Sequence, residues 1–393
     1  MAWKQGLVED QRGYLITEVL DKRRTVVTVC VELGISRQTA YKWFERYRQE
    51  GAQGLRDRSR RPKSQARQIK PEVVEQLVQL RGQHPTWGPK KLLAKLSEKQ
   101  RHPPCSSKTL GRWLKRFRLV RSPRRRIYHF VPTRSQGLTV AQAPNQVWTV
   151  DFKGHFSTQD RQRVDPLTVR DLYSKYGLAI ALLGGMDDAV VRPAFEDIFT
   201  RFGRPKTIRV DNGKPFAAEG PYGYSCLSLW WKRLGIEVEF TRPARPSDNG
   251  SHEQFHRVYK AETLQPAAAS PAEQQLRSNQ WLKEYNEQRP HEALGQIVPA
   301  RLYRASRRKY HPLSENFKYP KDWKVIRASR KGCINWKGRQ RLISRIVAGQ
   351  LIALKPGSQE SVLVYIGSLL LGSLHRDDPK GMRAAKKIPA AQL

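Results

Sequence analysis

Cysteine is scarce in this sequence: there are four residues in 393, and they lie far apart at Cys30, Cys105, Cys226 and Cys333. No two of them have the spacing of zinc ligands, which argues against a zinc finger and against a disulfide-stapled fold. Long apolar runs are also missing, because none approaches the roughly 18 residues of a membrane-spanning helix. The first residues do not lead into the apolar core of a signal peptide. We therefore expect reduced, buried cysteines in a cytoplasmic protein without a membrane partner.

Acidic residues are few, with 35 Asp and Glu against 73 Lys and Arg, so the formal net charge is +38. The excess lies at both ends of the chain. Residues 1–140 hold 32 basic and 11 acidic residues (+21), residues 301–393 hold 21 and 5 (+16), and residues 141–300 hold 20 and 19 (+1). A neutral middle between two basic arms predicts a polyanionic partner that spans the molecule. The length predicts three or four small domains.

Residues 25–50 have the pattern of a helix-turn-helix. An apolar helix stops at Gly34, and Ser36 then caps a second helix over residues 37–49. An αα-hairpin without a DNA role would have the same pattern. In the helix-turn-helix interpretation, the second helix presents four side chains to a major groove: Arg37, Gln38, Tyr41 and Lys42.

A basic linker without apolar periodicity is predicted over residues 51–65, and a second helical unit over residues 71–120. Its helices are expected at residues 72–83, 90–99 and 107–117. The last of them carries Arg112 and Lys115, and the run that follows includes Arg124, Arg125 and Arg126. These cations are candidates for phosphate contacts, which set affinity rather than sequence preference.

Residues 145–300 alternate between strand and helix patterns, which predicts a mixed α/β sheet. The predicted strands are residues 147–152, 167–172, 176–183, 206–210 and 236–241, and the predicted helices are residues 188–201, 227–234, 251–264 and 271–288. Short strands separated by turns over residues 323–374 predict a small β-barrel, followed by a frayed basic tail.

Three carboxylates in this middle segment are candidates for chemistry. Asp151 lies within an apolar strand, Asp211 closes another strand, and Glu253 lies in the first turn of a helix. Carboxylates from two strands and one helix can converge on hard cations, which prefer oxygen ligands. Two such ions suit an in-line phosphoryl displacement. Taken singly, Asp211 could merely begin a turn and Glu253 could merely favour a helix N-terminus.

Basic residues follow Glu253 along its helix. His256, Arg257 and Lys260 come three, four and seven positions later, so they share the face of the acid. This strip suits DNA lying across the acids, although a plain solvated helix face would show the same pattern.

Four ordered motifs resemble the integrase catalytic core of bacterial insertion-sequence transposases, which are relatives of retroviral integrases. The motifs are Trp148-Thr149-Val150-Asp151-Phe152-Lys153-Gly154, Asp171-Leu172-Tyr173-Ser174-Lys175-Tyr176, Asp211-Asn212-Gly213-Lys214-Pro215-Phe216 and Arg245-Pro246-Ser247-Asp248-Asn249-Gly250-Ser251-His252-Glu253. The resemblance covers residues 140–305. It implies a ribonuclease-H-like fold, a DDE metal site made of Asp151, Asp211 and Glu253, and a DNA contact for Lys260.

The expected architecture is therefore multidomain. The boundaries are 1–64 (helix-turn-helix and linker), 65–136 (second helical DNA-binding domain), 137–305 (catalytic core), 306–376 (DNA-binding barrel) and 377–393 (basic tail).

Two features depart from the family pattern. Asp211 and Glu253 are 42 positions apart, several more than usual, and the extra length is expected in a loop over residues 217–225. Lys175 stands where the family usually has arginine, which keeps the charge.

The expected activity is metal-dependent DNA cleavage at element ends and strand transfer into target DNA. Two Mg²⁺ (or Mn²⁺) ions would be the cofactors, and the partners would be terminal inverted repeats, target DNA and at least a second copy of the chain. The expected location is the bacterial cytoplasm, in association with the nucleoid.

Two alternatives remain open. A DNA-binding regulator would use the same basic arms with an inactive core. His252-Glu253-Gln254-Phe255-His256 also matches H-E-x-x-H, the zinc metalloprotease helix, but no third zinc ligand is recognisable downstream.

Overall fold

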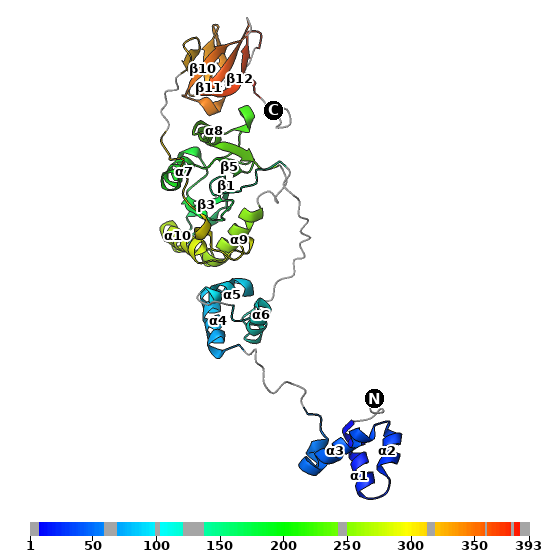
Figure 1. Ribbon diagram of the computed structural model, residues 1–393. Coiled ribbons are helices and arrows are strands. Elements are labelled where there is room, and N and C mark those ends of the chain that lie inside the picture. Colours follow the sequence, from blue (N-terminus) through cyan, green and yellow to red (C-terminus); the bar gives the residue numbers. More distant parts are fainter. Residues whose placement is uncertain are drawn as a thin grey trace. The chain divides into compact units, whose positions relative to one another are not determined.

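The computed structural model describes residues 8–58, 69–98, 103–120, 137–242, 250–312, 319–357, 360–378 and 381–385. The chain divides into two compact units, Met1–Gln68 and Ile69–Leu393, and each is described by itself (Figure 1).

The first unit is a bundle of the helices α1 (Val8–Leu20), α2 (Val26–Leu33) and α3 (Arg37–Glu50). Gly34 ends α2 with a φ of 67°, a left-handed conformation that suits glycine. The Ser36 hydroxyl then accepts a hydrogen bond from the Thr39 amide at 3.2 Å and caps α3. The predicted helix-turn-helix layout is present, and α1 adds a helix that the sequence reading did not include.

Residues 51–55 differ from the predicted linker. They form a 3₁₀ helix, Gly51–Leu55, and the Leu55 side chain is buried in the core of the bundle. The Arg12 side chain donates a hydrogen bond to the Leu55 carbonyl at 2.7 Å, which fixes this turn against α1. The linker prediction was therefore wrong for this turn, because one buried leucine is too short a signal for a periodicity search. Residues 59–68 lie outside the described part.

The second unit begins with three more helices, α4 (Pro71–Gln83), α5 (Pro89–Ser97) and α6 (Ser107–Arg116). They lie within two residues of the predicted positions. Buried leucines of all three surround Trp87, which is 1% exposed. The Arg81 side chain donates hydrogen bonds to the carbonyls of Trp87 and Leu119, so the turn before α5 and the end of this segment are tied to α4.

The central part of the second unit is a mixed six-stranded sheet with helices on both faces, as predicted. Its strands are β1 (Val147–Phe152), β2 (Phe156–Ser157), β3 (Arg163–Asp171), β4 (Gly177–Leu183), β5 (Thr207–Val210) and β6 (Glu237–Phe240). The order is β2-β3-β1-β5-β6, with β4 also paired to β3. β3 pairs antiparallel with both β1 and β4. On the other side of β1, β5 pairs parallel with β1, and β6 pairs parallel with β5. The strand β2 was not predicted.

Two pairs of helices cover this sheet (Figure 1). The helices α7 (Asp188–Phe202) and α8 (Cys226–Arg233) pack on the face that carries Trp148 and Val150. The helices α9 (Gly250–Thr263) and α10 (Pro271–Glu287) pack around Ile180 on the other face. Because side chains alternate between faces along a strand, Thr149 and Asp151 of β1 point toward α9 and α10.

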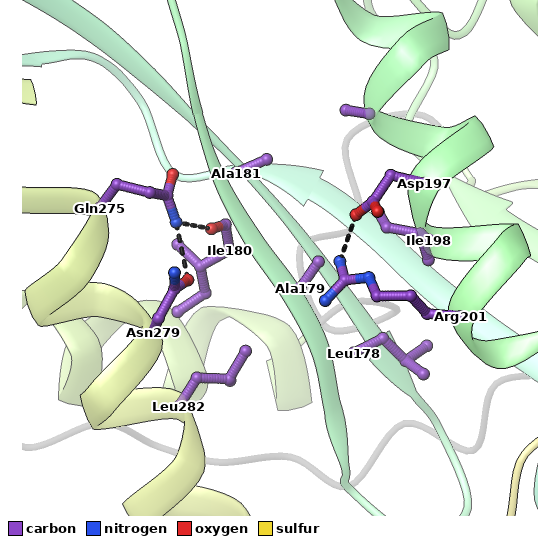
Figure 2. A pocket seen from close by; sticks show the side chains of 11 residues that line it. Leu178, Ala179, Ile180, Ala181, Asp197, Ile198, Arg201, Gln275, Asn279 and Leu282 are labelled. Atoms are coloured by element: carbon purple, nitrogen blue, oxygen red, sulfur yellow. Dashed lines mark hydrogen bonds and ion pairs between the residues drawn. The ribbon is translucent and has the colours of Figure 1, made fainter. Parts of the chain in front are cut away.

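The outer edge of β4 is covered by side-chain amides of α10 rather than by another strand. The Gln275 amide donates a hydrogen bond to the Ile180 carbonyl and accepts one from the Leu182 amide, both at 2.8 Å. Figure 2 shows the first of these bonds at a cavity of about 360 Å³ between β4, α7 and α10. Asn286 bonds both backbone groups of Gly177 in the same way. An exposed strand edge invites pairing with another chain, and these amides satisfy it internally.

The C-terminal part forms sheets but no closed barrel within the described residues. The strands β13 (Arg383–Ala384), β12 (Leu369–His375), β11 (Ser361–Ile366), β10 (Leu351–Pro356) and β7 (Lys324–Arg327) pair in that order, and β8 (Cys333–Trp336) pairs only with β9 (Arg339–Leu342). Closure would require the two edge strands to pair, and β7 and β13 have only four and two residues. The small β-barrel predicted for residues 306–376 is therefore replaced by an open sheet and a hairpin, which share one hydrophobic core with α8.

No helix in the described part of the chain is long and apolar enough to cross a membrane.

The first prediction concerns Gln275. Gln275→Ala should lower the free energy of unfolding by about 1–3 kcal/mol, because it leaves a backbone carbonyl and a backbone amide of β4 without their partner. Gln280→Ala, at an exposed position of the same helix, should change stability by less than about 0.5 kcal/mol. Urea denaturation of the full chain measures both, and equal stability of the two variants would contradict this role for Gln275.

Candidate active site

The register of the sheet brings Asp151 and Asp211 together. β1 and β5 are parallel neighbours in which Val147 pairs with Thr207 and Thr149 with Arg209. Continued for two more residues, the same register places Asp151 beside Asp211, where adjacent strands lie about 4.8 Å apart. This is the carboxyl end of parallel strands, where α/β proteins usually bind their ligands.

The turn after β5 orients Asp211. The Gly213 amide donates a hydrogen bond to an oxygen of the Asp211 carboxylate at 3.1 Å. A Cβ atom on Gly213 would lie 3.1 Å from the other carboxylate oxygen, so a larger residue here would press on the acid.

Glu253 lies on a helix rather than on a strand, in the first turn of α9. Its side chain is exposed, whereas His252 and His256 of the same helix are buried. The residues just before this turn, 243–249, carry most of the fourth motif and lie outside the described part.

The three carboxylates interact through their charges. The pKa of Asp151 is raised to about 7, mainly by burial and then by the negative charges of Asp211 and Glu253, while a backbone hydrogen bond from Phe152 and the charge of Lys153 oppose the shift. In the described residues, no three His, Cys, Asp or Glu side chains form a group that could hold a metal ion. Like charges in a partly buried site repel one another, so the acids would need a cation to draw closer.

Two lysines supply positive charge beside the acids. Lys153 follows β1, and its pKa is lowered by burial and by the charge of Lys260, while Asp151 opposes that shift. Lys260 and Arg257 are exposed on α9, as the helical spacing predicted. Lys153 belongs to the first of the four motifs, but the sequence predicts no role for it, because a single lysine next to a strand is a common surface feature.

The two histidines of the H-E-x-x-H match point into the sheet, and the Nδ1 atom of His256 lies 3.9 Å from an oxygen of the Asp151 carboxylate. His252 is 0% exposed, and its Nε2 atom lies 2.6 Å from the Thr168 hydroxyl; the Nε2 atom of His256 lies 2.7 Å from the same oxygen. Burial lowers the pKa of His252 well below its ordinary value and that of His256 to about 3, so both rings are neutral at pH 7. Because both Nε2 atoms are engaged by one hydroxyl, this arrangement disfavours the zinc metalloprotease alternative. The burial of His256 also argues against the predicted DNA contact for this residue.

The other predicted DNA-contact residues lie on exposed positions. Those on α3 are Arg37, Gln38, Tyr41 and Lys42, and those on α6 are Arg112 and Lys115. Arg124, Arg125 and Arg126 lie outside the described residues. The burial pattern therefore leaves the charged face of α3 accessible, while Trp43 and Ala40 face the core.

Lys175 lies in the turn between β3 and β4. Its ammonium group donates a hydrogen bond to the Leu172 carbonyl at 2.7 Å. Burial and the nearby charge of Arg170 lower its pKa to about 8. The lysine that replaces the family's usual arginine is thus half-buried, in a pocket that it lines together with Ser251 and Gln254 of α9.

Family models match four stretches of the chain. A helix-turn-helix domain matches residues 11–63, and a homeodomain-like domain matches residues 39–114. Two models of an integrase core domain match residues 141–246 and residues 234–299.

Curated relatives come from bacterial insertion elements. The IS407 uncharacterized 31.7 kDa protein of Burkholderia multivorans is 27% identical over 229 residues, which cover 58% of this chain and 79% of that protein. The IS476 uncharacterized 39.2 kDa protein of Xanthomonas euvesicatoria is 28% identical over 168 residues, which cover 42% of this chain and 46% of that protein.

Among solved structures, the HTLV-2 integrase catalytic core domain in complex with magnesium is 15% identical, with a TM-score of 0.34, over 42% of this chain and 100% of that one. The simian T-cell lymphotropic virus intasome in complex with a PP2A regulatory subunit is 17% identical, with a TM-score of 0.38, over 75% of this chain and 97% of that one.

The second prediction concerns the charge of Asp151. Because the pKa of this group is about 7 in the folded chain and about 3.9 in an unfolded one, the folded state alone holds the proton between these values. Stability is therefore lost as pH rises from 4 to 7, and the loss is constant above 7. Without divalent cations, Asp151→Asn should stabilise the chain by about 2–4 kcal/mol at pH 8 and by little at pH 4.

Thermal denaturation in EDTA at the two pH values measures this difference. Asp197→Asn, on an exposed part of α7, should change stability little at either pH. If Asp151→Asn destabilises the chain at pH 8, repulsion among the three acids is not the dominant charge effect.

Proposed function

We propose that this chain cleaves DNA at the ends of an insertion element and joins those ends to target DNA. It carries helix-turn-helix domains ahead of an integrase core, as bacterial insertion-sequence transposases do. The predicted resemblance to insertion-sequence transposases with an integrase core is confirmed by the family models and by the insertion-element relatives. The observation that supports the chemistry best is the parallel register of β1 and β5, which places Asp151 beside Asp211 at their carboxyl ends, with Glu253 near enough to Asp151 for its charge to raise the pKa of that group.

The three acids suit a divalent cation by their chemistry, and they would have to draw closer than they lie in this structure to hold one together. Three carboxylates offer oxygen ligands alone, the set preferred by Mg²⁺ and Mn²⁺. The charges of Asp211 and Glu253 add to the effect of burial in raising the pKa of Asp151, and a bound cation would oppose both contributions. Asp151, Asp211 and Glu253 would hold the metal. Two such ions, when bound, would stabilise the charge on the attacking and leaving oxygens of a phosphodiester displacement.

The chain's own cations would position the DNA. Lys153 and Lys260 lie beside the acids and would contact the phosphates that flank the scissile bond. Arg257 shares the exposed face of α9 and would extend this contact. Water would cleave at the element end, and the freed 3′-hydroxyl would then attack target DNA.

The segments of the chain would divide DNA recognition, the reaction and DNA clamping among them. Residues 1–64 and 65–136 are proposed to bind the terminal repeats, and residues 137–305 to carry the reaction. Residues 306–376 and the tail, 377–393, would clamp DNA through their basic side chains. Because two element ends must meet for integration, at least a dimer is expected on DNA.

The third prediction tests the carboxylates. Asp151→Asn, Asp211→Asn and Glu253→Gln should each reduce cleavage about a hundred-fold or more, because a neutral amide cannot replace a charge that holds a cation. Binding to DNA should be retained. The substrate is labelled DNA from the inverted repeats that flank the gene, incubated with Mg²⁺, and Asp197→Asn is the control that should cleave normally.

Two outcomes would revise the proposal. Near-normal cleavage by one of the three variants would remove that residue from the site. If the unaltered chain binds the repeats but cleaves none of them in Mg²⁺ or Mn²⁺, the regulator alternative explains the basic arms better.

The fourth prediction concerns α3. Replacing Arg37 and Lys42 together by alanine should weaken binding to the flanking repeats, and the slope of log affinity against log salt should fall by about two if each contacts one phosphate. Arg48→Ala, at an exposed position near the other end of α3, is the control and should keep the original slope. Fluorescence anisotropy at several salt concentrations measures both, and an unchanged slope in the double variant would exclude these two phosphate contacts.

A further inference from the structure

A buried hydroxyl, that of Thr168 on β3, is the meeting point of three hydrogen bonds next to the candidate active site. Thr168 is 0% exposed. Its Oγ1 atom donates a hydrogen bond to the backbone carbonyl of Asp151 at 2.9 Å. The Nε2 atoms of His252 and His256 lie 2.6 and 2.7 Å from the same oxygen. The register explains the first bond, because Thr168 is the direct antiparallel partner of Asp151.

The count of protons fixes the roles in this cluster. A carbonyl can only accept, so the single proton of the Thr168 hydroxyl is used on Asp151. Both histidines must then donate from Nε2 to the two lone pairs of Thr168. In a neutral ring the other nitrogen accepts, and the Nδ1 atom of His252 lies 3.0 Å from the Thr149 hydroxyl, which has a proton to give. Both rings are thus neutral and in the Nε2–H form, with the Nδ1 atom of His252 beside the Thr149 hydroxyl. The Nδ1 atom of His256 lies 3.9 Å from an oxygen of the Asp151 carboxylate.

The cluster joins the strand of one acid to the helix of another. Asp151 and Thr149 belong to β1, whereas both histidines belong to α9, and His252 immediately precedes Glu253. A further bond acts in the same place, because Arg170 of β3 donates to the Ser251 carbonyl in the first turn of α9 at 2.7 Å. The first turn of α9 is therefore fixed in rotation and in height against β1 and β3.

We propose that Thr168, with His252 and His256, forms a positioning cluster that holds the Glu253 carboxylate in register with Asp151 for a shared cation. The shared cation in this inference comes from the proposed function, whereas the hydrogen bonds of the cluster do not depend on that function. The three residues are positioning residues, because the Thr168 hydroxyl and both Nε2 atoms contact one another. The Nδ1 atom of His256 lies 3.9 Å from an Asp151 carboxylate oxygen, which is beyond hydrogen-bond distance. Groups of this kind, which orient metal-binding side chains without touching the metal, commonly change metal affinity or activity ten- to a hundred-fold when removed.

The fifth prediction compares Thr168→Val with Thr168→Ser. Valine keeps the size of threonine but removes the acceptor of both imidazoles and the donor to Asp151, whereas serine keeps the hydroxyl. In the cleavage assay with the flanking repeats, Thr168→Val should raise the Mg²⁺ concentration for half-maximal cleavage about ten-fold. Thr168→Ser should restore most of the affinity for Mg²⁺.

Thr263→Val is the matched control. Thr263 is also a buried threonine, and its hydroxyl also donates to a backbone carbonyl, that of Tyr259 at 2.7 Å, but it lies at the far end of α9. This variant should keep the Mg²⁺ dependence of the unaltered chain. Melting temperatures of all three variants in EDTA confirm that each is folded at the assay temperature. A Mg²⁺ dependence that is the same in Thr168→Val and Thr263→Val would overturn the positioning role.

A measurement without DNA separates this inference from the proposed function. In the full chain labelled with ¹⁵N-histidine, His252 and His256 should show the neutral Nε2–H form at pH 7 with slowly exchanging Nε2 protons, and Thr168→Val should abolish that protection. Mn²⁺ titration, followed by broadening of the histidine signals, should show weaker binding in Thr168→Val whether or not the chain cleaves DNA. Charged rings, the Nδ1–H form or unchanged Mn²⁺ affinity would each refute the cluster, whereas loss of cleavage alone would refute only the transposase activity.

Discussion

The structure depends on one constraint, which is that like charges must be held together in a partly buried place. The in-register pairing of β1 and β5 puts Asp151 beside Asp211 because of the backbone alone, and α9 then adds Glu253. Three neighbouring carboxylates repel one another without a cation, so the surrounding elements have to be fixed by interactions that add no further negative charge. The neutral cluster around Thr168 does this on one side, and the Asx turn at Gly213 does it on the other. The cost to stability of keeping the acids together is the expected counterpart of a site made to bind metal.

The distribution of charge along the chain follows from the same constraint. A core that concentrates acids would repel a polyanion, and residues 141–300 are in fact close to neutral, whereas the segments on either side carry +21 and +16. Affinity for DNA would therefore come mainly from the arms, through phosphate contacts. Within the core, Lys153 lies close enough to both Lys260 and Asp151 for their charges to shift its pKa, so local positive charge is present where a phosphate would approach the acids.

Much of this could be predicted from the sequence, and the misses have physical reasons. Helices and strands with clear periodicity are predicted within a few residues. The three acids are candidates because each interrupts an apolar pattern or begins a helix, and their role stays a prediction. The turn Gly51–Leu55 and the strand β2 were missed because elements this short have no period to detect. The open C-terminal sheet could not be distinguished from a barrel, since closure depends on whether edge strands pair, which local sequence does not encode. Thr168 was missed for the most general reason: its partner His252 lies 84 positions away, and a threonine within an apolar strand has no signal of its own.

The histidines flanking Glu253 show how a short motif can be compatible with two opposite chemistries. In a zinc protease both rings would bind the metal and the glutamate would act as the base, which requires the histidine face of the helix to look into the site. In this chain α9 has the opposite orientation about its own axis, because the side chains of His252 and His256 point into the sheet while that of Glu253 is exposed. The group that fixes this orientation lies outside the helix. The Thr168 hydroxyl on β3 accepts hydrogen bonds from both imidazole rings and donates one to the backbone carbonyl of Asp151, its partner on β1. The side of the helix that would bind zinc in one protein is thus, in this one, the side that packs against the sheet.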